Sequence, residues 1–212
     1  MSDSEKPEEE GQKETRGDCY AEGERGFMDW NQSLRGRVLR PVLKFLNDHD
    51  ITPNTLTLFS LLAGLLAALA LPFLNILGLV LLLVHVLLDG IDGPLARSTG
   101  TASKKGSFTD TASDQIVVFA VMLALVCMNA AGAAAAMVYV FSYTVVVGFA
   151  IIRNRLNIPY SWLIRPRFIV YAWIPVSFWL APLWTLDFLL WSCNVLLVAK
   201  VVTGFLKIRE KI

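Results

Sequence analysis

The sequence has little charge and little cysteine for its length. Only 17% of the 212 residues are Asp, Glu, Lys or Arg, whereas 55% are hydrophobic and the mean hydropathy is +0.53. This composition is too apolar for an ordinary soluble domain and is typical of a membrane protein. A net charge of +1 excludes a broadly basic surface, so we expect no nucleic-acid partner. The three cysteines are far apart, which favours neither a disulfide framework nor a zinc site.

The first part of the chain differs in composition from the rest. Residues 1–28 contain few aliphatic side chains and many acidic ones, with no apolar run of the kind that begins a secretory signal. Such a segment cannot bury enough apolar surface to offset the loss of chain entropy, so we expect a disordered acidic tail. The sequence therefore predicts a tail over 1–28 and one membrane domain over 29–212.

The membrane domain is predicted to be all-α, with an N-terminal amphipathic helix on the membrane surface and six transmembrane helices. The surface helix, over about 30–47, interleaves leucine and valine with arginine and lysine. Thr52 and Pro53 have the pattern of an N-cap and first-turn pair that opens the first span. We expect spans, each about long enough to cross a ~30 Å hydrocarbon layer, near residues 54–71, 75–92, 108–128, 133–152, 168–183 and 186–207.

Basic residues lie on only one side of this predicted topology. The links around 71–75, 128–132 and 181–187 contain no Lys or Arg. All 19 basic residues fall in the tail, the surface helix, the alternate links and the C-terminal end. The positive-inside rule makes that side cytoplasmic, together with both termini, and predicts a multi-pass integral membrane protein.

Acidic residues are rare after Asp50, and four of the six that remain gather where the second and third spans meet the cytoplasmic surface. Asp89 and Asp92 are three residues apart, and Asp110 and Asp114 are four apart, so each pair lies on one helix face. Carboxylates near a membrane core are costly and usually functional. Four together need cations, and oxygen-only ligands favour Mg²⁺ or Mn²⁺. Two divalent cations would balance the four charges and suit phosphoryl chemistry.

The residues around these aspartates match the pattern D-x-x-D-G-x-x-A-R-x8-G-x-x-x-D-x-x-x-D in full. This pattern is the signature of the CDP-alcohol phosphotransferase (CDP-alcohol phosphatidyltransferase) family, which the chain resembles from about Trp30 to its C-terminus. The resemblance implies a phospholipid-biosynthetic transferase that moves a phosphatidyl group from a CDP-linked lipid, with CDP-diacylglycerol favoured, to an acceptor hydroxyl and releases CMP. It also implies a site on the cytoplasmic side and, by resemblance alone, a homodimer.

The resemblance also assigns roles to the motif residues. Asp89 and Asp110 would bridge both metal ions, Asp92 would complete the first, and Asp114 would complete the second and act as general base. Arg97 would act with them, because its planar fork can bind phosphate. Small residues leave room for the nucleotide, and Gly106 is expected to permit the turn into the third span. The expected CDP-lipid contacts are Thr52, Pro53, Asn54, Thr55, Gly93, Ala96, Arg97, Ser103 and Gly106.

The acceptor is less constrained by the sequence. Four arginines lie around the link between the fourth and fifth spans, at Arg153, Arg155, Arg165 and Arg167. They favour a phosphorylated acceptor such as glycerol 3-phosphate, although positive-inside anchoring alone would also place arginines there.

Two other functions stay open at this point. One is an intramembrane prenyltransferase of the UbiA type, although such enzymes typically have more helices and widely separated motifs. The other is a cation transporter that binds its ion with the same carboxylates, although transporters commonly show internal repeats and ligands near the bilayer midplane.

Overall fold

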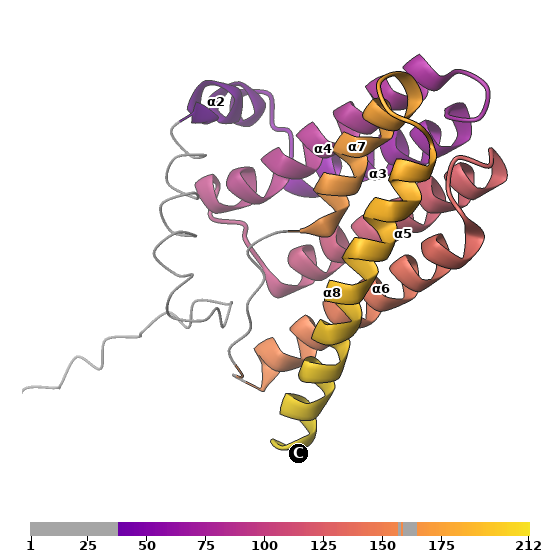
Figure 1. Ribbon diagram of the computed structural model, residues 1–212. Helices are drawn as coiled ribbons and strands as arrows, with labels where there is room; N and C mark the ends of the chain where they lie inside the picture. Colours follow the sequence, from indigo (N-terminus) through magenta and orange to yellow (C-terminus); the bar gives the residue numbers. More distant parts are fainter. Residues whose placement is uncertain (1–37, 157, 159–164) are drawn as a thin grey trace, which may run out of the picture.

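The computed structural model describes residues 38–156, 158 and 165–212, and every regular element within these ranges is a helix. The helices are α2 (Arg40–Asp48), α3 (Pro53–Ala70), α4 (Asn75–Ser98), α5 (Lys104–Cys127), α6 (Ala133–Arg155), α7 (Pro166–Trp179) and α8 (Trp184–Arg209) (Figure 1). The all-α prediction is therefore confirmed for this part of the chain. The predicted tail and the first residues of the predicted surface helix, up to residue 37, lie outside the described residues.

Five of these helices, α3, α4, α5, α6 and α8, are long and apolar enough to cross a membrane. The sixth predicted span corresponds to α7, which has 14 residues and ends at Trp179 rather than near residue 183. At ~1.5 Å per residue it is about 21 Å long, shorter than a ~30 Å hydrocarbon layer. The prediction of six full spans is thus supported for five helices.

The helix α4 runs six residues beyond its predicted end at Asp92. Pro94 lies inside it and is buried, as is Leu95, which packs with Leu43 of α2 and Leu56 of α3. A proline removes one backbone donor, and the burial of the following turn offsets that loss. As a result Ala96 and Arg97 belong to a helix and not to a loop.

The helix α5 begins four residues earlier than predicted. Ser103 is its N-cap, and the side-chain oxygen of Ser103 accepts the N–H of Gly106 at 3.0 Å. Gly106 therefore lies in the first helical turn, and the prediction that it forms the turn into this helix is wrong. The residue with the left-handed backbone in this link is Gly100, with φ +68°.

The helices pack in a few principal pairs: α3 with α4 and α5, α6 with α5 and α8, and α7 with α8. Close approach of α3 and α5 depends on Gly64, because a Cβ there would lie 2.5 Å from a methyl group of Val117. The core continues along α5 through Val121 and Leu125. This packing fixes the end of α5 that carries Asp110 and Asp114.

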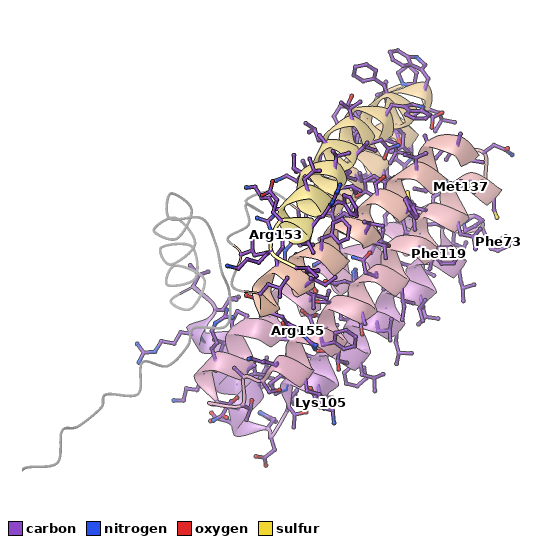
Figure 2. The ribbon with its side chains drawn as sticks, turned by 90° about the horizontal axis from the view of Figure 1, so that it is seen from below. Phe73, Lys105, Phe119, Met137, Arg153 and Arg155 are labelled. Atoms are coloured by element: carbon purple, nitrogen blue, oxygen red, sulfur yellow. The ribbon has the colours of Figure 1, made fainter. Side chains whose placement is uncertain are left out.

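The two ends of the bundle differ in chemistry. Figure 2 shows Lys105, Arg153 and Arg155 at one end, with Phe73 and Met137 toward the other. Phe73 and Met137 are 85% and 72% exposed. This separation agrees with the distribution of basic residues in the sequence, and the cytoplasmic assignment of the basic end remains a prediction.

Candidate active site

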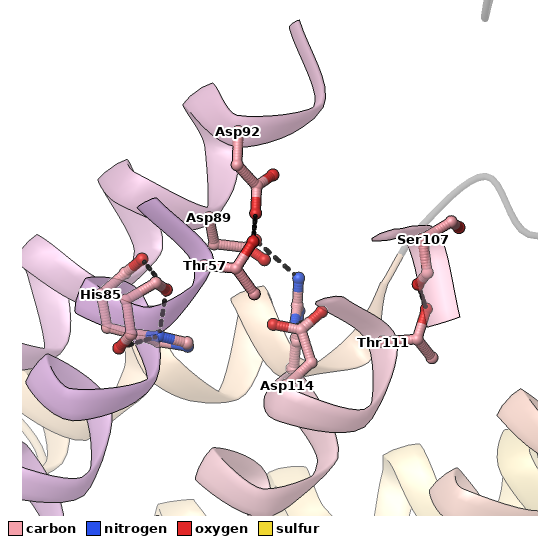
Figure 3. Close-up of polar contacts among 9 residues, drawn as sticks. Thr57, His85, Asp89, Asp92, Ser107, Thr111 and Asp114 are labelled. Carbon is pink, nitrogen blue, oxygen red and sulfur yellow. Dashed lines mark hydrogen bonds and ion pairs between the residues drawn. The ribbon is translucent and has the colours of Figure 1, made fainter. Parts of the chain in front are cut away.

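Three of the four motif aspartates form one group at the junction of α4 and α5. One carboxylate oxygen from each of Asp89, Asp110 and Asp114 lies within 4.8 Å of the others. Two oxygens bound to one Mg²⁺ at about 2.1 Å are at most about 4.2 Å apart, so small side-chain movements would let the group hold a divalent cation. Figure 3 shows Asp89 and Asp114 facing a common space.

Asp92 lies outside this group of three but remains part of the cluster, because its carboxyl contacts that of Asp110. It is buried, and its Oδ2 accepts the hydroxyl hydrogen of Thr57 at 2.8 Å (Figure 3). Sequence reasoning missed Thr57. The only signal in the sequence was a hydroxyl side chain one helical turn after Pro53. This signal is weak, because a threonine inside a helix commonly donates its hydroxyl hydrogen to the carbonyl oxygen four residues earlier. The Thr57 hydroxyl does lie 3.2 Å from the carbonyl oxygen of Pro53.

Arg167 joins the carboxylates of two helices. Its Nη2 lies 2.7 Å from Oδ2 of Asp89, and its Nη1 forms an ion pair with Oδ2 of Asp114. The guanidinium also lies over the Phe168 ring, 4.7 Å from the centroid, and the side chain is only 1% exposed. The sequence placed Arg167 among the acceptor-binding candidates, but the structure places it against two predicted metal ligands.

The other acceptor candidates lie in different surroundings. Arg165, at the start of α7, is exposed and lines the large cavity described below. Arg153 and Arg155 belong to the last turn of α6, and Arg155 is exposed. A common role for all four arginines therefore has no support in their positions, and a role in acceptor binding stays a prediction.

A cavity of about 1520 Å³ adjoins the carboxylates, and Asp89, Asp92 and Asp110 form part of its wall. Of the nine predicted CDP-lipid contacts, eight line it: Thr52, Pro53, Asn54, Gly93, Ala96, Arg97, Ser103 and Gly106. The ninth, Thr55, bonds Thr52 through both its backbone N–H and its hydroxyl. The structure describes both Asp114 and Arg167, and neither of them lines the cavity.

Two helices begin at this cavity. Thr52 caps α3 by accepting the N–H of Thr55 at 3.3 Å, as predicted, and Ser103 caps α5. Helix N-termini carry partial positive charge and unpaired N–H groups, so both ends favour an anion in the cavity. The cavity thus has carboxylates for cations beside helix ends for anions.

The cavity continues away from the carboxylates along an apolar groove between α4 and α7. Its walls include Ile76, Leu79, Val80, Leu83 and Val86 of α4 and Ile169, Ala172, Pro175 and Trp179 of α7. From Ile76 to Asp92 the helix rises about 24 Å at ~1.5 Å per residue. A ligand with a charged head and a long apolar chain fits this shape.

His85 lies one turn before Asp89 and is buried between α3 and α4. Its Nδ1 is 3.0 Å from the backbone oxygen of Ser60 and 2.8 Å from the Ser60 hydroxyl oxygen. The Ser60 hydroxyl in turn donates to the backbone oxygen of His85 at 3.1 Å. These bonds describe a histidine that joins α3 to α4.

Sequence comparison with known proteins gives both a family and relatives. The family model "CDP-alcohol phosphatidyltransferase" matches residues 50–206. The chain is 37% identical over 100 residues to a bifunctional IPC transferase and DIPP synthase of Aquifex aeolicus, covering 47% of this chain and 23% of that protein. It is 40% identical over 87 residues to an archaetidylinositol phosphate synthase of Pyrococcus horikoshii, covering 39% of this chain and 46% of that protein. The chain thus spans less than half the length of these relatives.

The fold is shared with solved structures. Phosphatidylinositol phosphate synthase (PgsA1) of Mycobacterium tuberculosis with CDP-DAG bound superposes with a TM-score of 0.67 at 23% identity, covering 81% of this chain and 94% of that one. The same protein with manganese and citrate gives 0.65 at 21% identity, covering 79% and 87%. The family model spans nearly all of the helical domain and contains the complete aspartate motif, so this chain belongs to the CDP-alcohol phosphatidyltransferase family.

Proposed function

We propose that this protein transfers a phosphatidyl group from CDP-diacylglycerol to the hydroxyl of a phosphorylated polyol and releases CMP. The observation that carries the proposal is the continuity of one cavity, which joins three motif aspartates to a long apolar groove. A soluble CDP-alcohol would leave the groove unfilled, whereas a CDP-linked lipid would fill both parts.

The head of the donor would lie between the helix ends. The N-termini of α3 and α5 and the guanidinium of Arg97 favour the diphosphate. Gly93 lies beside the Arg97 side chain, and a Cβ there would make an ordinary contact with Nη1 of Arg97 at 3.5 Å. The acyl chains would follow the groove between α4 and α7.

The aspartates would hold two divalent cations, Mg²⁺ or Mn²⁺, with Asp89, Asp110 and Asp114 around one and Asp92 contributing to the other. When bound, such ions neutralise the diphosphate and stabilise charge on the leaving group. Asp114 would take the proton of the acceptor hydroxyl. The oxygen of that hydroxyl would form a bond to the lipid-linked phosphorus while the bond between this phosphorus and CMP breaks. Thr57 would keep the Asp92 carboxylate in place.

The acceptor is inferred from charge and from relatives. Arg165 puts a cation on the cavity wall, and Arg153 and Arg155 end the neighbouring helix α6. The names of the similar proteins, archaetidylinositol phosphate synthase and phosphatidylinositol phosphate synthase, add inositol phosphate to glycerol 3-phosphate as candidates. Membership of the family sets aside a UbiA-type prenyltransferase and a cation transporter. A cytoplasmic site and a homodimer remain part of the proposal.

The test is an acceptor screen with purified protein, CDP-diacylglycerol and Mn²⁺ or Mg²⁺. The acceptors are glycerol 3-phosphate, inositol 1-phosphate, glycerol, inositol and serine, and the readouts are CMP release and the mass of the lipid product. We expect product with a phosphorylated polyol and none with Asp114→Asn. Product from an unphosphorylated acceptor alone would overturn the acceptor assignment, and no CMP with any acceptor would overturn the proposed reaction.

A further inference from the structure

Arg167 occupies an unusual position for a buried arginine. It comes from α7, yet its two terminal nitrogens pair with Asp89 of α4 and Asp114 of α5. Burying a guanidinium is costly unless its charge is paired, and here both partners are residues that the family motif assigns to metal binding. The arginine therefore already supplies positive charge to the cluster.

Charge counting shows that this role conflicts with full metal occupancy. When all three are ionised, the grouped carboxylates carry −3, and Arg167 reduces this to −2. Four aspartates carry −4, which two divalent cations balance without any arginine. With both ions bound and no diphosphate in the cavity, the guanidinium would be a surplus positive charge in a buried site, where like charges repel strongly.

The geometry points the same way. Arg167 uses Oδ2 of Asp89 and Oδ2 of Asp114, two oxygens from the residues that would bind the cation. Among the described residues, Asp114 and Arg167 both lie outside the cavity lining, whereas Asp89 and Asp110 line it. The ion pair with Arg167 thus occupies an oxygen of Asp114 that would otherwise bind a cation or accept a proton.

We propose that Arg167 is a built-in counter-ion of the carboxylate cluster, which competes with divalent cations for Asp89 and Asp114. It stabilises the metal-free protein and lowers its affinity for metal. This inference rests on the proposal that the cluster binds divalent cations. The ion pairs of Arg167 and cation binding use the same carboxylates, so the two are thermodynamically coupled. A free energy that Arg167 contributes only to the metal-free state is lost when the metal binds, and the affinity for metal is lower by that amount.

The experiment measures Mn²⁺ binding to detergent-purified protein by electron paramagnetic resonance of the free ion. We compare the wild type with Arg167→Gln and with the control Arg165→Gln, which removes the same charge from the cavity wall. We expect Arg167→Gln to bind Mn²⁺ about tenfold more tightly, within the usual range for coupled sites. In EDTA its melting temperature should fall, and saturating Mn²⁺ should raise that temperature more than in the wild type. Arg165→Gln should change the Mn²⁺ affinity by less than about threefold.

Unchanged or weaker Mn²⁺ binding by Arg167→Gln, or an unchanged melting temperature in EDTA, would overturn the inference that Arg167 competes with divalent cations. If Arg167→Gln does not fold, Arg167→Lys replaces it, because a single ammonium cannot bridge two carboxylates and should give an intermediate gain in affinity. Wild-type protein that binds no Mn²⁺ overturns this inference and the metal site together. Wild-type protein that binds Mn²⁺ but releases no CMP overturns only the proposed reaction.

Discussion

Thr57 of α3 donates its hydroxyl hydrogen to Oδ2 of Asp92 on α4, across 2.8 Å in a buried contact. This bond joins the helix whose N-terminus faces the cavity to the motif aspartate that lies outside the group of three. Hydrogen bonds to metal ligands fix the orientation of the ligand, and their loss weakens binding although they do not touch the metal.

Replacement of Thr57 by valine should therefore weaken metal binding. Valine keeps the shape of threonine but removes the donor, so the Asp92 carboxylate loses its buried partner. We expect the Mn²⁺ concentration for half-maximal activity to rise by about 10- to 100-fold. The measurement is a Mn²⁺ titration of CMP release. Thr57→Ser keeps the hydroxyl and should stay close to the wild type, and equal titrations for the two variants would rule out the role of this bond.

Replacement of Asp114 by asparagine should abolish turnover while leaving donor binding largely intact. Asparagine cannot accept the proton of the acceptor hydroxyl, so we expect CMP release to fall by about 10²- to 10⁴-fold. The donor should still bind, because among the described residues Asp114 is not part of the cavity wall. Turnover and CDP-diacylglycerol binding are measured on the same preparation. The variants Asp89→Ala and Asp110→Ala should lose Mn²⁺ affinity as well as turnover. Unaltered Mn²⁺ affinity in both variants would contradict the predicted bridging position of these two aspartates.

Much of the architecture follows from the sequence because hydrophobic length, caps and charge distribution are local signals. Thr52 and Pro53 mark the start of α3, and the spacing of Asp89, Asp110 and Asp114 brings them together once two helices meet. The extra turn after Pro94 was not predictable from propensity, since it depends on the burial of Leu95.

The partner of a charged residue is harder to predict than its presence. Arg167 lies 78 residues from Asp89 in the chain, and nothing local distinguishes it from the exposed Arg165 two residues earlier. Only the packing of α7 decides that one arginine enters the carboxylate cluster and the other faces the cavity.

Replacement of Gly64 by alanine should destabilise the bundle beneath the site. The added Cβ would lie 2.5 Å from a methyl group of Val117, three residues after Asp114 on α5. Such overpacking usually costs about 1–3 kcal/mol, seen as a lower melting temperature in detergent. Val117→Ala should recover part of this loss in the double variant, because it removes the clashing methyl groups. Gly148→Ala is the control, since nothing lies within 4 Å of its new Cβ. A double variant no more stable than Gly64→Ala would exclude this contact as the cause.

Replacement of Ala172 by phenylalanine should narrow the apolar groove and make the enzyme selective for short acyl chains. Ala172 is an exposed residue of α7 that lines the groove opposite α4, far enough along it to meet an acyl chain rather than the diphosphate. A ring there would exclude a long chain but leave room for a short one. We expect kcat/KM for dioleoyl CDP-diacylglycerol to fall by about tenfold relative to the dioctanoyl donor.

The matched control is Val195→Phe, which enlarges a 69% exposed side chain on α8 outside the groove and should leave this ratio unchanged. An equal loss with both donors would mean that Ala172→Phe perturbs the fold or the polar part of the cavity. An unchanged ratio in Ala172→Phe would mean that the acyl chains lie elsewhere, because a chain that follows the α4–α7 groove has to pass this position.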